Sequence, residues 1–168
     1  MAERHSVWGE GTDVGLLGGV AVAVFFLILD ILAGHPLRTP SVLGQVVLFG
    51  EGRPDIMHID FGAVLLYTVV HFALFALFGV LLVKVIHMAT DNPVVRFAVL
   101  IVFVAFELFF YGVVAMLSAT TRDLFPFWRV LAANTIAALV MGTYLWRSHP
   151  ALRQALYATP LGDMGDRD

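Results

Sequence analysis

Two ionisable side chains, His71 and Glu107, lie near the middle of long apolar segments. Ionisable groups are costly in hydrocarbon unless they are buried and paired, so both positions indicate a functional or structural purpose. Tyr67 and Tyr111 each lie one helical turn from one member of the pair. If the two segments are antiparallel neighbours, the imidazole and the carboxyl group reach the same depth and a hydrogen bond between them is feasible.

Asn134 and Asp30 extend this polar set. Asn134 lies about two turns into the last apolar segment, and Asp30 lies about one turn from the end of the first. Residues 14–29 and 72–83 carry no ionisable side chain, whereas a conduit across a membrane needs relay groups or water on both sides of the midplane. The asymmetry favours a one-sided, outward-facing pocket over a channel. A structural hydrogen-bonded lock between helices is the alternative for His71 and Glu107.

A second polar group gathers where the first apolar segment ends and the second begins. His35, His58 and Asp60 lie there, and Asp30 lies just below them. Two imidazoles and two carboxylates could bind zinc, copper or iron. The spacing matches no standard motif, and polar residues at the ends of membrane spans are ordinarily solvated boundary groups. The metal site is therefore the less favoured interpretation.

A stripe of small residues, Gly11, Gly15, Gly19 and Ala23, recurs every four positions along the first apolar segment. Such a stripe lets a second helix approach closely. It can serve a membrane-protein partner, a homo-oligomer or packing inside the same bundle, and the last of these is favoured. A similar stripe of Ala133, Ala137 and Met141 on the last segment could face the first.

These residues need elements that hold them, and the composition indicates membrane-spanning helices. The chain has 168 residues, of which 60% are hydrophobic and 14% charged. Four apolar runs, residues 14–34, 61–86, 94–119 and 127–146, approach or exceed the roughly 20 residues needed to cross hydrocarbon. The runs are continuous and lack the alternation of barrel strands, so helices are expected. The prediction is an all-α integral membrane protein whose residues 1–147 form an antiparallel four-helix bundle in the lipid bilayer.

The connection between the first two spans carries a helix signal of its own. Thr39 can cap a helix, Pro40 suits its first position, and Gly50 can end it. The apolar segment at about 40–49 is too short to cross a bilayer. We expect an interfacial or re-entrant helix in the first outer loop.

The orientation follows from the distribution of positive charge, because cytoplasmic loops carry an excess of Lys and Arg. Six positive residues lie on the side of the termini: Arg4, Lys84, Arg96, Arg147, Arg153 and Arg167. Four lie on the other side: Arg38, Arg53, Arg122 and Arg129. Both termini are therefore expected in the cytoplasm, with residues 148–168 as a polar, partly disordered tail.

Several functional classes are excluded or disfavoured. The chain has no cysteine, which removes thiolate metal sites and cysteine nucleophiles. A net charge of -3 without a basic stripe gives no footprint for nucleic acid. Phosphate-binding glycine loops, nucleophile elbows and the zinc-protease helix motif are missing, which counts against an enzyme. No cofactor can be assigned from the sequence.

The run from His35 to Gly44, the following Leu48-Phe49-Gly50 and the segment 67–72 resemble a pattern found in bacterial four-span inner-membrane proteins of unassigned activity. The resemblance covers much of the first half of the chain. It implies a bacterial inner membrane and the same four-helix fold, and it brings no activity.

Two classes of function follow. The favoured class is a non-enzymatic membrane protein, either an accessory subunit of a larger complex or a binder of a small ligand in an outward-facing pocket. The competing class is a membrane enzyme or transporter that uses His71 and Glu107, with Tyr67 and Tyr111, for proton-linked or metal-assisted chemistry.

Overall fold

The structure, a computed structural model, describes residues 7–91, 101, 104, 105, 107, 108, 112 and 125–150, with side chains masked at 89–91. Most of the expected third span, 94–119, lies outside these residues, and so do Tyr111 and most of the tail expected at 148–168. The described residues form helices and no strand.

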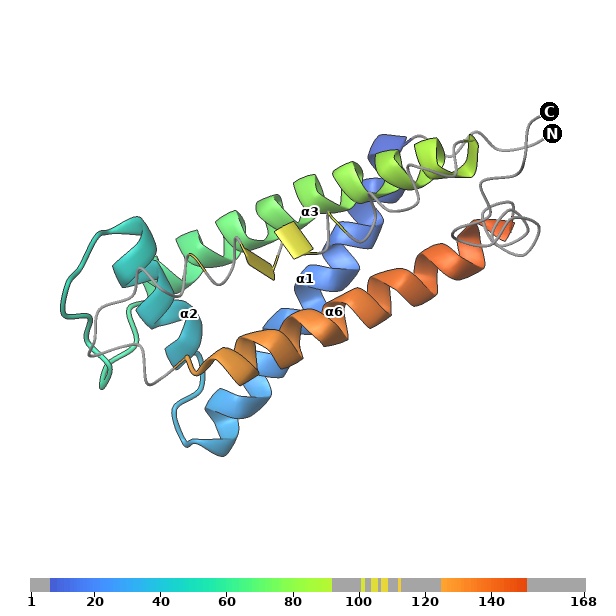
Figure 1. Cartoon of the computed structure of the whole chain (residues 1–168). Coiled ribbons are helices and arrows are strands. Elements are labelled where there is room, and N and C mark those ends of the chain that lie inside the picture. The colour runs from blue at the N-terminus through green and yellow to red at the C-terminus, as the bar shows by residue number, and fades with distance from the viewer. Residues whose placement is uncertain are drawn as a thin grey trace, which may run out of the picture.

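Three long helices dominate the described part of the chain (Figure 1). They are α1 (Val7–Leu32), α3 (Phe61–Asp91) and α6 (Phe127–Ser148), and α1 packs against both of the others. Helices α1 and α3 are long and apolar enough to cross a membrane. At 1.5 Å per residue, the 26 residues of α1 extend over about 39 Å, which exceeds the hydrocarbon thickness of a bilayer.

Glycines bring α1 and α3 into backbone contact. A Cβ added at Gly79 would overlap the backbone of Gly11 and Gly15, and one added at Gly15 would overlap the carbonyl of Phe75. The predicted stripe on α1 therefore packs inside this chain against α3 and does not face the small residues of α6. Ala23, its last member, lines a pocket instead.

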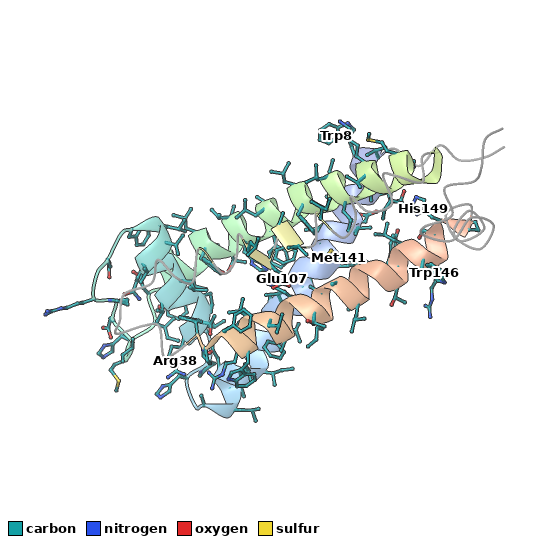
Figure 2. The ribbon with its side chains drawn as sticks, viewed as in Figure 1. Trp8, Arg38, Glu107, Met141, Trp146 and His149 are labelled. Atoms are coloured by element: carbon teal, nitrogen blue, oxygen red, sulfur yellow. The ribbon has the colours of Figure 1, made fainter. Side chains whose placement is uncertain are left out.

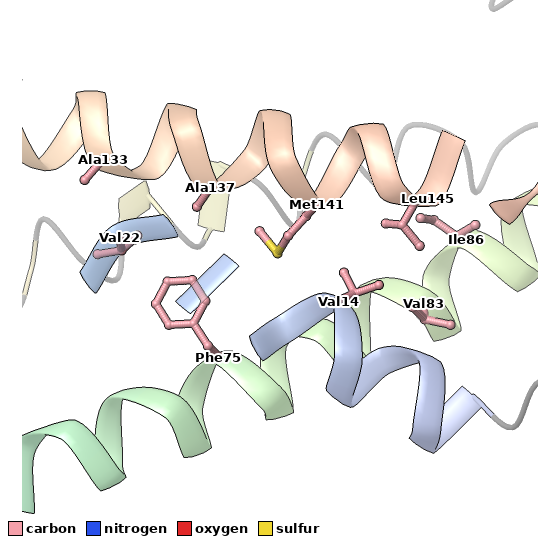
Figure 3. Packing of buried hydrophobic residues seen from close by; sticks show 9 residues of the cluster. All are labelled: Val14, Val22, Phe75, Val83, Ile86, Ala133, Ala137, Met141 and Leu145. Carbon is pink, nitrogen blue, oxygen red and sulfur yellow. The ribbon is translucent and has the colours of Figure 1, made fainter. Parts of the chain in front are cut away.

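The other face of α1 packs against α6. Ala133, Ala137 and Met141 are buried, and the Met141 side chain contacts Gly18, which lies outside the stripe. Figure 3 shows how the buried side chains of the three helices meet between the ribbons: Val14, Val22, Phe75, Val83, Ile86, Ala133, Ala137, Met141 and Leu145. Small residues on α6 bring the helix close enough for the larger side chains of α1 and α3 to fill the space.

A short helical unit connects α1 to α3. It consists of α2 (Arg38–Leu43), followed directly by a π-helical turn, η1 (Gly44–Leu48). The helix begins one residue before the position expected to cap it, because Leu37 turns the chain with a left-handed φ of 65°. Thr39 thus lies inside the first turn and is not the cap. Its backbone N–H is satisfied by the Asp30 carboxylate of α1.

Candidate functional site

A pocket of about 290 Å³ lies at the end of the bundle where α2 packs. Residues of α1, α2, α3 and α6 line it, and most of the lining side chains are apolar. The polar side chains on its wall are Asp30, Thr39, Tyr67, Thr68, His71 and Asn134. The fold therefore brings together four of the six residues predicted for a polar site: Asp30, Tyr67, His71 and Asn134.

His71 is held by the backbone of α1. Its Nε2 lies 3.1 Å from the carbonyl oxygen of Gly19. A carbonyl only accepts, so Nε2 carries the proton and Nδ1 of the neutral ring is an acceptor. A Cβ at Gly19 would lie 3.0 Å from the ring of Phe72, so the missing side chain lets α1 and α3 approach closely beside this contact.

Glu107 has a different partner from the one expected. Its Oε2 accepts a hydrogen bond of 3.1 Å from the Asn134 amide, and its Oε1 is buried without a partner. Figure 2 shows Glu107 in the interior, beside α6. No hydrogen bond joins His71 to Glu107 among the described residues. The prediction paired polar side chains with each other, whereas the His71 imidazole hydrogen-bonds to a main-chain carbonyl.

Tyr67 lies one turn from His71 on the pocket wall. The two rings are stacked with centroids 5.9 Å apart and an interplanar angle of 28°. The Tyr67 hydroxyl makes no hydrogen bond with another residue in the described ranges. Among the described residues, two polar atoms of the pocket wall have no hydrogen-bond partner, the Tyr67 hydroxyl and the Nδ1 of His71.

Asp30 is a structural residue at the rim of the pocket. Its two carboxylate oxygens accept hydrogen bonds from the backbone N–H and the hydroxyl of Thr39, at 2.7 and 2.8 Å. The Asp30 side chain is buried, so these bonds replace the water it loses. They fix α2 against the end of α1 and thereby set the shape of the pocket.

Asp30→Ala is expected to lower the free energy of unfolding by about 1–3 kcal/mol, because it leaves the buried N–H of Thr39 without an acceptor. Thermal unfolding in detergent, followed by tryptophan fluorescence, measures the loss. Asp30→Asn keeps one acceptor oxygen and should fall between the wild type and the alanine variant. An unchanged unfolding temperature in Asp30→Ala would show that the connection contributes nothing.

The residues of the weaker metal prediction are not gathered into one site. His58 is exposed and pairs with Asp55 at 2.8 Å, and the side chain of Asp60 caps α3 through the N–H of Ala63. The Asp55 carboxylate has a pKa below its ordinary value, chiefly because the backbone N–H of Met57 donates to it and also because His58 does. His35 belongs to no group of three potential metal ligands among the described residues.

The buried side chain of Gln45 anchors the loop that carries Asp55 through hydrogen bonds. Gln45 donates to the carbonyl of Asp55 at 3.3 Å and accepts from the N–H of Asp55 at 2.7 Å. Ser41 accepts from Gln45 and from the N–H of Asp60. Asp55, Asp60 and their neighbours therefore have structural partners, which explains why they do not converge on a metal.

Sequence reasoning missed part of the pocket wall. Phe125 lies beside Phe127 and Trp128 at the start of the last apolar segment, where aromatic side chains commonly mark the membrane interface. Phe125 is instead buried against Val42 and Leu43 of α2 and lines the pocket, while its two aromatic neighbours are exposed. Hydropathy cannot separate an inward from an outward aromatic at a span end. Helical phase would have placed only Trp128 outward. Phe127 lies seven residues before the buried Asn134, which puts the two on the same side of α6.

Comparison of the chain with protein-family models, with curated proteins and with solved structures gives no match.

Proposed function

We propose that this chain is an integral inner-membrane protein with a four-span bundle that binds a small, mostly apolar ligand in the pocket beside Tyr67 and His71. The remaining span is contributed by residues 94–119, and both termini lie in the cytoplasm. The α2 and η1 unit covers the outer end of the bundle as an interfacial element.

The exposed surface of the helices supports the membrane location. Along α1 and α3, large apolar side chains point outward as well as inward, including Val20, Ile28, Leu65, Val69 and Leu77. Soluble monomers rarely expose apolar patches larger than a few hundred Å². Lipid accounts for a helix that is apolar on every side.

The contacts at the two ends of the bundle indicate which end faces the cytoplasm. The end of α6 lies beside the start of α1, where His149 Nδ1 is 3.4 Å from a Glu10 carboxylate oxygen. The pocket lies at the opposite end, near α2. With cytoplasmic termini, as the distribution of Lys and Arg favours, the pocket belongs to the outer half.

The observation that carries the ligand proposal is the combination of apolar walls with two polar atoms that have no partner in the described part of the chain. Ligand pockets are typically apolar with a few placed polar groups, and 290 Å³ is near the lower end of their size range. His71 Nδ1 accepts and the Tyr67 hydroxyl can donate. A ligand hydroxyl can donate to the first and accept from the second. The ligand class that fits is therefore a neutral lipid-like or aromatic alcohol.

Native mass spectrometry of the full chain, extracted in mild detergent from the membrane in which it is made, tests this proposal. The expected result is one organic molecule per chain, identified as a hydroxyl compound after solvent extraction. Thr68→Trp should abolish its retention, because Thr68 lines the pocket and an indole would fill it. Val69→Trp is the matched control, since Val69 lies next along α3 and is 59% exposed.

Tyr67→Phe refines the assignment, since it removes only the hydroxyl. Rebinding of the identified compound should weaken by about 1 kcal/mol, the net value of one hydrogen bond. A wild-type chain that carries no organic compound would overturn the ligand proposal. A stoichiometric protein partner in its place would favour the accessory-subunit function.

A proton-linked enzyme or transporter gains less support. That function was expected to use His71 and Glu107 together, whereas the described contacts give each a separate structural partner. Proton exchange between two groups requires them to lie within hydrogen-bond reach, directly or through one water. We therefore propose binding and not catalysis.

A further inference from the structure

Three side chains converge at the end of the bundle opposite the pocket. Glu10 lies in the first turn of α1, His87 near the end of α3, and His149 directly after α6. One ligand atom from each lies within 4.8 Å of the other two, and no other group of three such residues occurs in the described ranges. Figure 2 shows His149 where α6 ends. From this arrangement we propose a binding site for a divalent transition metal, with Zn²⁺ as the best fit.

The two less exposed members, Glu10 and His149, make no side-chain hydrogen bond with another described residue. Glu10 is only 7% exposed, and a carboxylate so deeply buried is costly without compensation. His149 Nδ1 lies 3.4 Å from Glu10 Oε1, yet it is a buried nitrogen without a hydrogen bond. The two groups face each other at a distance that is long for a hydrogen bond.

That separation is the one a shared zinc ion would impose. Zinc bonds to nitrogen and oxygen are about 2.0–2.1 Å, which places adjacent ligand atoms of a tetrahedral site about 3.3 Å apart. Glu10 and His149 already have this spacing. The third ligand need move only modestly, and the exposed side of the His87 ring gives the ion a route from solvent.

His87 is oriented for coordination. Its Nδ1 lies 2.9 Å from the carbonyl of Val83, one turn earlier in α3, so Nδ1 carries the proton and Nε2 is left to bind an ion. Metal-bound histidines usually donate their second ring nitrogen to a carboxylate or a backbone carbonyl in this way. The rings of His87 and His149 are perpendicular, with centroids 5.1 Å apart. The two rings can therefore approach one ion from different directions.

Two imidazoles and one carboxylate form a zinc ligand set that leaves a fourth position for water. The site would join α1, α3 and α6, and a bound ion would clamp the cytoplasmic end of the bundle. This inference is independent of the ligand pocket, because no residue is shared between the two sites.

The test is a titration of the full chain, without a histidine tag and stripped with a chelator, with Zn²⁺ by calorimetry and with Co²⁺ by absorption. We expect one equivalent of either ion and the intense visible bands of tetrahedral Co²⁺. His87→Ala should weaken binding on the order of 100-fold, since loss of a ligand costs at least as much as loss of its supporting shell. His87 is exposed, so this variant is expected to fold.

Glu10→Gln gives a second variant, because it keeps the side-chain shape and removes the anionic ligand. It should also weaken binding strongly and abolish the rise in unfolding temperature caused by Zn²⁺. The matched control is His58→Ala, which removes an exposed histidine from the other end of the bundle and should bind as the wild type does. Absence of stoichiometric binding, or wild-type affinity in His87→Ala, would overturn the proposal.

Discussion

Gly79→Ala is expected to lower the free energy of unfolding by about 3 kcal/mol, the upper end of the range for overpacking. The added methyl group would overlap the backbone of Gly11 and Gly15 on α1. A flexible side chain could move aside, but helix backbone cannot, so α1 and α3 must separate along their contact. Unfolding in mixed micelles with increasing denaturing detergent, followed by circular dichroism, measures the effect.

Gly142→Ala is the matched control for this substitution. Gly142 also lies within a long helix, but an added Cβ meets no atom within 4 Å. The same change should therefore leave stability unaltered or raise it by about 0.5–1 kcal/mol, since alanine favours helix over glycine. Equal effects at the two positions would refute the close contact between α1 and α3. Gly15→Ala should behave like Gly79→Ala, because its methyl group would meet the carbonyl of Phe75.

Three of the four predicted apolar segments overlap the long helices of the described residues, and the fourth, 94–119, lies mostly outside them. Hydropathy does not locate the helix ends. α1 begins at Val7, well before the expected start at residue 14, and α3 continues to Asp91 beyond residue 86. Hydropathy marks the part of a helix that lipid would surround. The polar first turns of α1 instead pack against α3 and His149 within the protein, as at Gly11 and Glu10, and so stay helical without being apolar.

The polar residues of the pocket could be identified from the sequence because each interrupts an apolar segment. The hydrogen-bond partners of these residues could not be identified in this way. His71 binds a carbonyl that is accessible only because α1 and α3 approach closely at Gly19, and Asp30 binds an N–H whose position depends on the turn at Leu37. Backbone groups are present at every residue, so the sequence does not show which of them a side chain will reach.

The cluster of Glu10, His87 and His149 was beyond prediction for a related reason. Each residue lies near the end of a different helix, where a solvated side chain is the ordinary expectation. No spacing within one segment links them, because the three helix ends meet only in the folded bundle. Glu10 differs from an ordinary solvated carboxylate in being deeply buried, and this burial depends on the packing of all three helices.

Asn134→Ala is expected to lower the free energy of unfolding by about 2 kcal/mol. Hydrogen bonds between helices in membranes average only about 0.6 kcal/mol in such measurements, because the unfolded chain in the membrane also finds partners. Here the cost is larger, since the Oε1 of Glu107 already has no partner and loss of the amide leaves the whole carboxyl group unpaired. Thr135→Ala is the control, because that exposed hydroxyl donates only to the carbonyl of Leu131 in its own helix.

The double variant Glu107→Leu with Asn134→Leu separates the value of the bond from the cost of an orphaned group. Removing both polar partners can be nearly neutral, whereas removing one leaves a buried group unsatisfied. We expect the double variant to recover most of the stability lost in Asn134→Ala, measured by the same unfolding titration. If instead the double variant is as unstable as the sum of the two single leucine variants, the two side chains do not interact. Recovery would indicate that this polar contact fixes which faces of two helices meet and contributes little net stability.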